Sequence, residues 1–507
     1  MRRAPHRSQS GISLNTKTRT PRFALPKPLV PFVRTELLAG LLVAVALIPE
    51  AIAFSIIAGV DPSVGLFSSV IMAVSIAFLG GRPAMISAAT GAMALVVAPL
   101  VASHGVGYMI AATLLAGVIQ VVLALTGVAK LMRYIPRSVF VGFINALAIL
   151  IFLAQLPHLK GQPWPVWAIA IGALAVIGLF PLLTKAIPAP LVAIVILTSI
   201  TVVFAISVPT VSSMGELPSG LPWLTLPGVP LTLETLQVIA PYALGLALVG
   251  LLESLMTAKV VDDATDTRSS KTRESLGQGI GNVLVGAFGG MASCAMIGQT
   301  MINVKSGARS RLSTFAAGGF LLILIVALHD VVGVIPMAVL VAIMVFVAFV
   351  TFDWHSISPK TLKNMPISET VTMVATVAAT VATHNLAIGV GVGVMVAMVV
   401  FARKASNLVE VTSVTDPDGC TEVYAVTGEL FFASSNQLVE AFDYHCEPGT
   451  VVIDLSDAHI WDSSAVAALD AVREKYHKAG KDIEVIGFNK SSQEIHEKLS
   501  GELTSAH

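Results

Sequence analysis

Charged residues are scarce in this chain of 507 residues, of which only 12% are Asp, Glu, Lys or Arg. Hydrophobic residues make up 55%, and the mean hydropathy is +0.82, well above that of ordinary soluble domains. A membrane-crossing helix needs about 20 apolar residues, and residues 35–402 hold enough apolar runs for roughly twelve to fourteen such helices. The composition therefore predicts a polytopic α-helical membrane protein.

Catalytic and metal-binding patterns are missing as well. The three cysteines, Cys294, Cys420 and Cys446, have no metal-ligand spacing and imply no disulfide framework. No Walker phosphate loop, pair of catalytic carboxylates or Ser/His constellation stands out. An ATP-driven pump or an enzyme has no basis in this sequence, and we expect neither a cofactor nor a resident metal.

The N-terminal 28 residues lack the apolar core of a signal peptide. They are basic, polar and contain proline, so we expect residues 1–28 to form a disordered cytoplasmic tail. Residues 29–405 would form the transmembrane domain.

Basic residues are almost missing from one set of loops between the predicted spans. Of the 31 Lys and Arg residues, only Lys160 falls on that side, and the long loop 208–235 has Glu216 and Glu234 but no basic residue. By the positive-inside rule this side is external, both termini are cytoplasmic and the number of spans is even. We expect a multi-pass protein of the cytoplasmic (inner) membrane.

Composition changes after Lys404, where charged residues return at ordinary frequency. Residues 406–507 therefore read as a small soluble α/β domain, large enough to bury one core. We predict alternating strands and helices at residues 423–432, 436–445, 450–455, 464–479, 483–487 and 491–499, beginning with a strand.

Polar residues inside the predicted spans are rare exceptions. Glu253 and Thr257 lie four residues apart on one face of a helix predicted near residues 236–260. A carboxylate there costs about 2.5 to 3.5 kcal/mol on insertion scales, which indicates a function. Glu50 lies inside the first predicted span and is the third such residue.

A series of short motifs runs along the chain in a specific order: Pro49-Glu50-Ala51-Ile52-Ala53-Phe54, Ala58-Gly59-Val60-Asp61-Pro62, Gly65-Leu66-Phe67, Gly142-Phe143, Gln155-Leu156, Glu274 through Asn282, and Asn303 through Arg309. Together they resemble the SulP family of anion permeases, which is related to the animal solute carriers that include prestin. The C-terminal domain resembles the STAS domain of sulfate transporters and anti-sigma factor antagonists. The resemblance spans residues 35–500.

The resemblance implies fourteen transmembrane segments in two inverted repeats of seven, divided into a core and a gate as in uracil permease. The third and tenth segments would be half helices whose N-termini meet at the membrane midplane. Small residues do interrupt apolar runs at residues 87–91 and 289–294, and two helix N-termini would each offer an anion about half a positive charge. Close helix packing is the alternative explanation for these small residues.

The anion site implied by the resemblance needs no basic side chain. Relatives place Arg or Ser in the first turn of the tenth segment, whereas this chain has Ala295, Ile297 and Gly298. Binding would then rest on backbone amides and on the hydroxyls of Thr90 and Ser293. The expected anion-binding residues are Ser87, Ala88, Ala89, Thr90, Ser293, Cys294, Ala295 and Met296.

Glu253 and Thr257 are the expected coupling-ion residues. In sodium-dependent bicarbonate members of the family, an acidic residue and a Thr at the matching positions help to hold Na⁺. A buried carboxyl group could equally carry a proton. Because this chain has Glu rather than Asp there, we favour H⁺ over Na⁺. A carboxylate that only accepts hydrogen bonds from amides of the tenth segment is the purely structural alternative.

Glu50 stands where relatives often have Gln. It is either a second titrating group or a helix-contact residue, and Phe54 and Gln299 are further polar or gate-facing candidates. In the STAS domain, Ser463 matches the serine that anti-sigma factor antagonists phosphorylate, although it also stands where a helix cap is expected. The resemblance further implies a homodimer and a cytoplasmic regulatory partner of the STAS domain.

The sequence thus favours a secondary transporter of small inorganic anions, with sulfate/H⁺ symport first. A Na⁺-coupled bicarbonate importer, a dicarboxylate transporter and a non-transporting anion sensor that signals through STAS remain as alternatives.

Overall fold

The computed structural model describes residues 29–127, 135–184, 188–216, 220–225, 227–230, 232–406, 409–415, 421–445 and 449–500. The predicted tail 1–28, Cys420 and Cys446 lie outside these residues.

The described residues in the first half of the membrane domain form seven main helices. They are α1 (Leu29–Ala58), α2 (Pro62–Leu79), α3 (Gly91–His104), α4 (Val106–Leu125), α5 (Arg137–Leu159), α6 (Trp164–Leu179) and α7 (Ala189–Val203). A three-residue strand, β1 (Ser87–Ala89), precedes α3, and the short 3₁₀ turns η2 (Phe180–Leu182) and η3 (Val211–Ser213) follow α6 and α7.

The second half repeats this order. Its main helices are α8 (Leu233–Thr265), α9 (Lys271–Ala287), α10 (Ile297–Lys305), α11 (Arg311–Ala327), α13 (Met337–Thr351), α15 (Ile367–Thr383) and α16 (Leu386–Ser406). The strand β2 (Ser293–Ala295) precedes α10, as β1 precedes α3, and the short helices α12 (His329–Gly333) and α14 (Pro359–Asn364) lie between main helices.

Seven helices among the described residues are long and apolar enough to cross a membrane, and five more are apolar but shorter. The third and tenth segments are short for a structural reason. With 9 residues at 1.5 Å each, α10 is about 14 Å long, half of a hydrocarbon layer of about 30 Å. Helix α10 thus has the length of a half helix, whereas α3, with 14 residues, is about 21 Å long. The count of fourteen spans stays a prediction.

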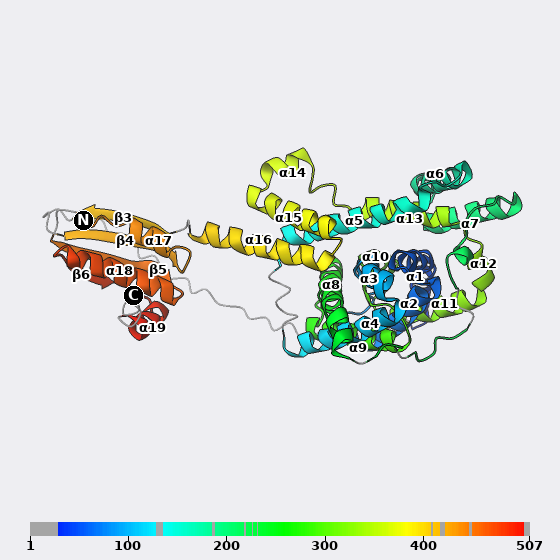
Figure 1. Ribbon diagram of the computed structural model, residues 1–507, viewed down its shortest axis with the longest axis horizontal. Coiled ribbons are helices and arrows are strands. Elements are labelled where there is room, and N and C mark those ends of the chain that lie inside the picture. The colour runs from blue at the N-terminus through cyan, green and yellow to red at the C-terminus, as the bar shows by residue number, and fades with distance from the viewer. Residues whose placement is uncertain are drawn as a thin grey trace, which may run out of the picture.

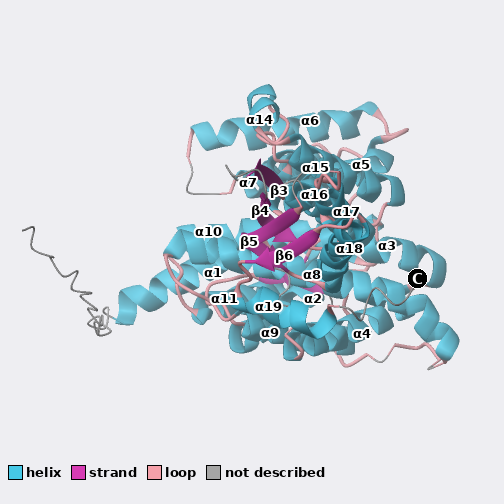
Figure 2. Ribbon diagram, turned by 90° about the vertical axis from the view of Figure 1, so that its left-hand side faces the viewer, coloured by secondary structure: helices cyan, strands magenta, loops and turns pink. Residues whose placement is uncertain are grey.

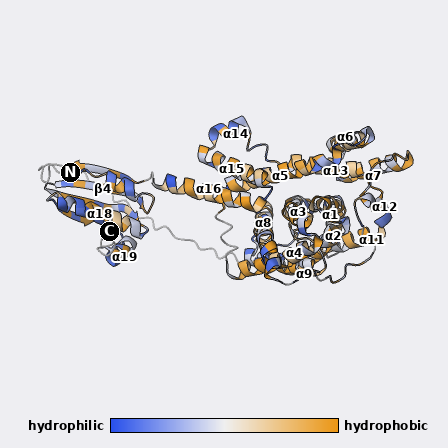
Figure 3. Ribbon diagram, in the orientation of Figure 1, coloured by the Kyte–Doolittle hydropathy of each residue, from blue (hydrophilic) through white to orange (hydrophobic). Residues whose placement is uncertain are grey.

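The helices form two groups, as Figure 1 shows. One group, the core, contains α1 to α4 and α8 to α11, with α1 packed on α11 and α4 on α9. The other, the gate, contains α5 to α7, α13, α15 and α16. Helices α4 and α9 approach closely at Gly117 and Gly279, where a Cβ on either glycine would lie within 3.0 Å of the other's carbonyl oxygen. Hydrophobic residues, coloured orange in Figure 3, are found in both groups.

The strands β1 and β2 lie side by side inside the core. They pair antiparallel, with Ser87 opposite Ala295, Ala88 opposite Cys294 and Ala89 opposite Ser293, and all six residues are buried. The two predicted breaks thus meet in space, as the interpretation of two opposed half helices requires.

The C-terminal domain contains a β-sheet and helices (Figure 2). Its described residues form a four-stranded sheet and three helices. Its elements are β3 (Glu410–Thr415), β4 (Thr421–Leu430), α17 (Ser435–Glu440), β5 (Thr450–Ile460), α18 (Ser463–Lys478), β6 (Asp482–Ile486) and α19 (Lys490–Leu499). The strand order is β3-β4-β5-β6, with β3 antiparallel to β4 and the other neighbours parallel.

All six predicted elements of this domain exist, and three details of the prediction were wrong. The edge strand β3 was missed, because four of the polar residues and Val414 on it are exposed and leave no clear alternation. Strand β5 extends five residues beyond Leu455. Helix α17 ends at Glu440, and a turn follows in which Asp443 accepts a hydrogen bond from the His445 N–H (2.9 Å).

Candidate functional site

A cavity of about 660 Å³ lies between the core and the gate. Core residues from α1, the start of α3, α8 and the start of α10 line one wall, and apolar residues of α5, α7 and α13 line the other. No Lys, Arg or His is among the residues that line it, and the polar side chains are few: Glu50, Thr90, Glu253, Gln299 and Thr351.

Two helix N-termini point into this cavity from β1 and β2. Thr90 is the N-cap of α3 and accepts a hydrogen bond from the Met93 N–H at 3.3 Å. Met296 is the N-cap of α10 and makes no side-chain cap. Gly91 and the first three residues of α10, Ile297 to Gln299, also line the cavity. The first-turn amides of a helix lack intrahelical acceptors and carry partial positive charge, so this wall suits an anion.

Three amides of the strands already donate to side chains of the core. The Ala89 N–H donates to Ser69 Oγ (3.2 Å), the Ser293 N–H to Asn282 Oδ1 (2.8 Å) and the Ala295 N–H to Ser254 Oγ (3.1 Å). These bonds hold β1 and β2 in place, so the strands support the cavity wall instead of presenting donors to it.

The predicted anion-binding residues are therefore divided by the structure. Thr90 and Met296 line the cavity, whereas the others lie behind it in the strand pair: Ser87, Ala88, Ala89, Ser293, Cys294 and Ala295. Small residues mark the break in a helix and not the point where the next helix begins, so most of the predicted residues precede the first turns that line the cavity. Gly91 and the apolar gate residues were missed.

Glu253 faces the cavity, and Thr257 does not. The Cys294 thiol donates to Glu253 Oε2 at 2.7 Å, and Thr90 lies within hydrogen-bonding reach of both side chains. The Thr257 hydroxyl is fully buried and donates to the backbone carbonyl of Glu253, one turn earlier on α8 (2.7 Å). Thr257 thus bonds the helix backbone, and its hydroxyl does not meet the Glu253 carboxyl group.

Glu50 and Gln299 form a second polar pair in the cavity wall. Their side chains are hydrogen-bonded to each other, which joins α1 to the first turn of α10. Phe54, one turn after Glu50, packs on Gly91, where a Cβ would lie 2.9 Å from the ring. All three predicted secondary residues, Glu50, Phe54 and Gln299, therefore lie at the cavity.

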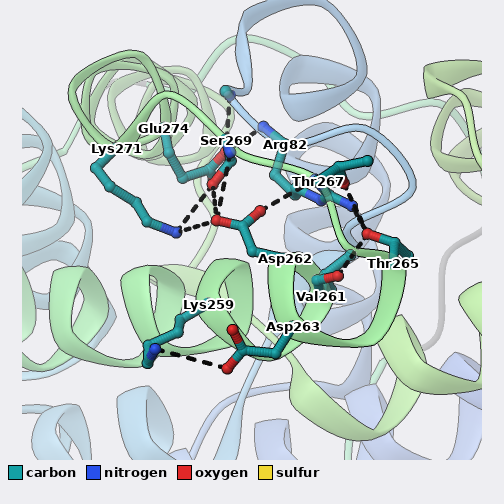
Figure 4. Close-up of polar contacts among 11 residues, drawn as sticks. Arg82, Lys259, Val261, Asp262, Asp263, Thr265, Thr267, Ser269, Lys271 and Glu274 are labelled. Carbon is teal, nitrogen blue, oxygen red and sulfur yellow. Dashed lines mark hydrogen bonds and ion pairs between the residues drawn. The ribbon is translucent and has the colours of Figure 1, made fainter. Parts of the chain in front are cut away.

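A charged cluster lies at the C-terminal end of α8 (Figure 4). Asp262 accepts hydrogen bonds from Arg82 Nη1 (3.0 Å) and Lys271 Nζ (2.9 Å), and the Arg82 side chain is only 7% exposed. Arg82 also donates to Thr265, the last residue of α8, and to Thr267 just beyond it. The cluster fixes α8, and with it Glu253, to the loop that precedes β1.

In the C-terminal domain, Asp462 and not Ser463 caps α18. Its carboxylate accepts a hydrogen bond from the Ala465 N–H at 3.0 Å. Ser463 is the first residue of the helix, and it is exposed.

Comparison with known proteins identifies the family. The model of the sulfate permease family matches residues 33–166 and 163–376, and that of the STAS domain matches residues 412–500. The chain belongs to the sulfate permease family. It is 51% identical over 468 residues to a Bacillus subtilis (strain 168) protein named "Putative sulfate transporter YbaR", covering 92% of this chain and 97% of the relative.

Two solved structures share its architecture. The transmembrane domain of a cyanobacterium bicarbonate transporter, BicA, is 28% identical and superimposes with a TM-score of 0.64, over 70% of this chain and 97% of that one. The overall structure of SLC26A9 superimposes with a TM-score of 0.78 over 93% of this chain and 87% of that one, at 16% identity, which shows the fold. The protein is thus a multi-pass anion transporter of this family and not an enzyme.

Proposed function

We propose that the protein is a secondary active transporter that moves sulfate together with protons by alternating access. One observation carries the proposal: Glu253 lies in the same cavity as the N-termini of α3 and α10. The two termini together offer about one positive charge. A carboxyl group beside them competes with the anion when it is ionised and donates to the anion when it is protonated, which couples the two.

Protons are the coupling ion that the side-chain contacts favour. A sodium site needs several oxygen ligands around the ion, because Na⁺ is a hard cation. Here a thiol donates to one oxygen of Glu253, and the Thr257 hydroxyl lies against the helix backbone outside the cavity lining, so the two residues do not present their oxygens together to an ion in the cavity. The polar neighbours of Glu253 are the thiol of Cys294 and the hydroxyl of Thr90, and a carboxyl group with such neutral neighbours can carry a proton.

In this proposal the structure represents the inward-facing state, in which the cavity opens to the cytoplasm. It extends from Glu253 to Pro181, Pro188 and Thr351, which lie beside the predicted cytoplasmic loops that contain Lys185, Lys360 and Lys363. The positive-inside rule then places this opening, and both termini, on the cytoplasmic side of the inner membrane. Movement of the core against the gate would close this opening and expose the site externally.

Sulfate is placed first because of the relative that is 51% identical and bears that name. Bicarbonate is the second candidate, because BicA has the same arrangement of helices at 28% identity. A dicarboxylate would also fit the cavity volume, so the substrate has to be decided by flux measurements.

The domains have separate roles in this proposal, with residues 29–405 as the transport domain and 406–507 as the STAS domain. Ser463 is exposed at the first position of α18, where a phosphate would meet the positive end of the helix. A cytoplasmic kinase or phosphate-sensing partner, and pairing of two STAS domains in a homodimer, would act there on transport.

The decisive experiment is uptake of sulfate, bicarbonate and fumarate by the protein in liposomes, under an inward proton gradient, an inward sodium gradient or neither. We expect sulfate to accumulate only with the proton gradient, and Glu253→Gln to abolish accumulation while sulfate still exchanges across the membrane. If accumulation follows the sodium gradient, the coupling ion is Na⁺ and not H⁺. Sulfate binding without flux would instead identify a sensor, and full accumulation by Glu253→Gln would reject the coupling role.

A further inference from the structure

The only cysteine among the described residues lies against the coupling carboxyl group. Cys294 is in β2, opposite Ala88, and its side chain is fully buried. Its sulfur lies 2.7 Å from Glu253 Oε2 and 3.2 Å from Thr90 Oγ1. Three elements meet in this contact: the start of α3, the strand β2 and the middle of α8.

The direction of the hydrogen bonds follows from the groups. An ionised carboxylate only accepts, so the single S–H proton goes to Glu253. The Thr90 oxygen already accepts from the Met93 N–H, so the Thr90 O–H is free to donate to the sulfur or to Glu253. The result is a chain from the N-cap of α3, through the thiol, to one oxygen of the carboxyl group.

We propose that Cys294 is a positioning residue for coupling, which holds Oε2 of Glu253 with its thiol so that Oε1 faces the anion cavity. This inference rests on the proposed role of Glu253. A free Glu side chain rotates about several bonds, and the cavity leaves room for that rotation. The thiol removes this freedom at one oxygen, Oε2, and would leave the other oxygen to take up the proton and meet the anion.

A thiol suits this position because it is a weak donor. It orients the carboxyl group but holds it weakly, so that the group can still take up a proton. Because Cys294, Thr90 and Glu253 all belong to the core, the contact is kept when the core moves against the gate. A serine hydroxyl at the same place is smaller and a stronger donor, so it would restore the orientation. An alanine would keep the backbone of β2 and remove the donor.

The test uses full-length protein with Cys420→Ser and Cys446→Ser as the background, so that Cys294 is its only thiol. In liposomes we expect Cys294→Ala to lose most of the proton-driven sulfate accumulation while sulfate exchange, without a gradient, stays within about twofold. Cys294→Ser should recover accumulation. Full accumulation by Cys294→Ala would overturn the inference, as would equal loss by Ser and Ala.

An infrared spectrum supplies a readout that does not depend on transport. The S–H stretching band of Cys294 should lie at the lower frequency of a hydrogen-bonded thiol, and Glu253→Ala should shift it towards the frequency of a free thiol. A band that stays unchanged in Glu253→Ala would reject the contact. The two claims also fail separately, because Glu253→Gln with full accumulation rejects the coupling role, whereas Glu253→Gln that fails beside a fully active Cys294→Ala rejects only the positioning role.

Discussion

The side-chain amide of Asn282 makes two hydrogen bonds with the backbone of Ser293. Its oxygen accepts the Ser293 N–H at 2.8 Å, and its nitrogen donates to the Ser293 carbonyl at 3.0 Å and to Gln120 Oε1 at 2.9 Å. One turn earlier on α9, Gln278 donates to the Ser87 hydroxyl at 2.8 Å. Helix α9 thus holds both short strands, and with them the wall from which the two half helices begin.

Asn282→Asp is expected to destabilise the protein. The substitution keeps the acceptor for Ser293 N–H but places a second oxygen against two buried acceptors, which costs at least about 1 to 3 kcal/mol. The check is the thermal unfolding temperature in detergent, measured above pH 7. Asn385→Asp is the matched control, because in the described contacts the Asn385 side chain acts through its oxygen, which accepts from the N–H groups of Ala387 and Ile388 at the start of α16. A control that loses as much stability as Asn282→Asp would contradict the explanation.

Much of the fold was predictable because apolar and polar segments alternate along the chain, and few structures can bury such apolar segments. Apolar runs separated by basic loops predicted a multi-pass bundle, and the interruptions at residues 87–91 and 289–294 predicted the paired breaks. The C-terminal elements were predictable from alternating strand and helix patterns. Strand β3 was not, because an edge strand with few buried residues has no pattern to detect.

The site was predictable only in part, because its two walls differ in kind. Glu50 and Glu253 were identified because charge is costly inside a membrane. The gate wall was missed because it is lined by apolar residues such as Phe140 and Phe346. In the sequence, apolar residues that face a cavity cannot be told from apolar residues that face lipid. The contact of Cys294 with Glu253 joins residues 41 positions apart and has no local signature.

The charged cluster of Figure 4 provides a second prediction. Asp262→Asn removes the only carboxylate that pairs with Arg82 among the described residues and leaves a guanidinium whose side chain is 7% exposed without a counter-ion. Loss of one partner of a buried pair costs about 3 to 5 kcal/mol. We expect a large drop in thermal stability and poor yield of folded protein, because the end of α8 loses its anchor.

The neighbouring acid is the control for that change. Asp263 pairs with Lys259 one turn away at 3.6 Å, and both side chains are more than 60% exposed. Exposed pairs of this kind contribute about 0.3 to 0.5 kcal/mol, so Asp263→Asn should unfold almost as the wild type does. Equal effects of the two substitutions would show that net charge, and not the buried contact, matters.

Gly298 allows anion binding and stability to be separated. It lies in the first turn of α10 and lines the cavity, and a Cβ added there meets no atom within 4 Å. Gly298→Ala should therefore raise helix stability by up to about 1 kcal/mol. The methyl group stands in front of the first-turn amides, so we expect the KM for sulfate to rise roughly tenfold, or about 1.4 kcal/mol.

Gly319 in α11 is the matched control, because it also has open space around an added Cβ and lies away from the cavity lining. Gly319→Ala should raise stability similarly and leave the KM unchanged. If Gly298→Ala transports with the KM of the wild type, the α10 amides do not bind the anion.

Glu50 provides a prediction about charge balance. If Glu50 and Glu253 each carry a proton, one sulfate moves with two protons and no net charge crosses the membrane. Glu50→Gln keeps an amide partner for Gln299 but removes one proton, so that each cycle carries one negative charge inward. One charge moved through 100 mV corresponds to about 2.3 kcal/mol, which is enough to drive flux.

We therefore expect an inside-positive potential, set with potassium and valinomycin, to speed sulfate uptake by Glu50→Gln and to leave the wild type unaffected. Glu234→Gln, at the start of α8 outside the cavity lining, should behave as the wild type. A voltage-independent Glu50→Gln would assign Glu50 to helix contact, with Glu253 as the single proton carrier.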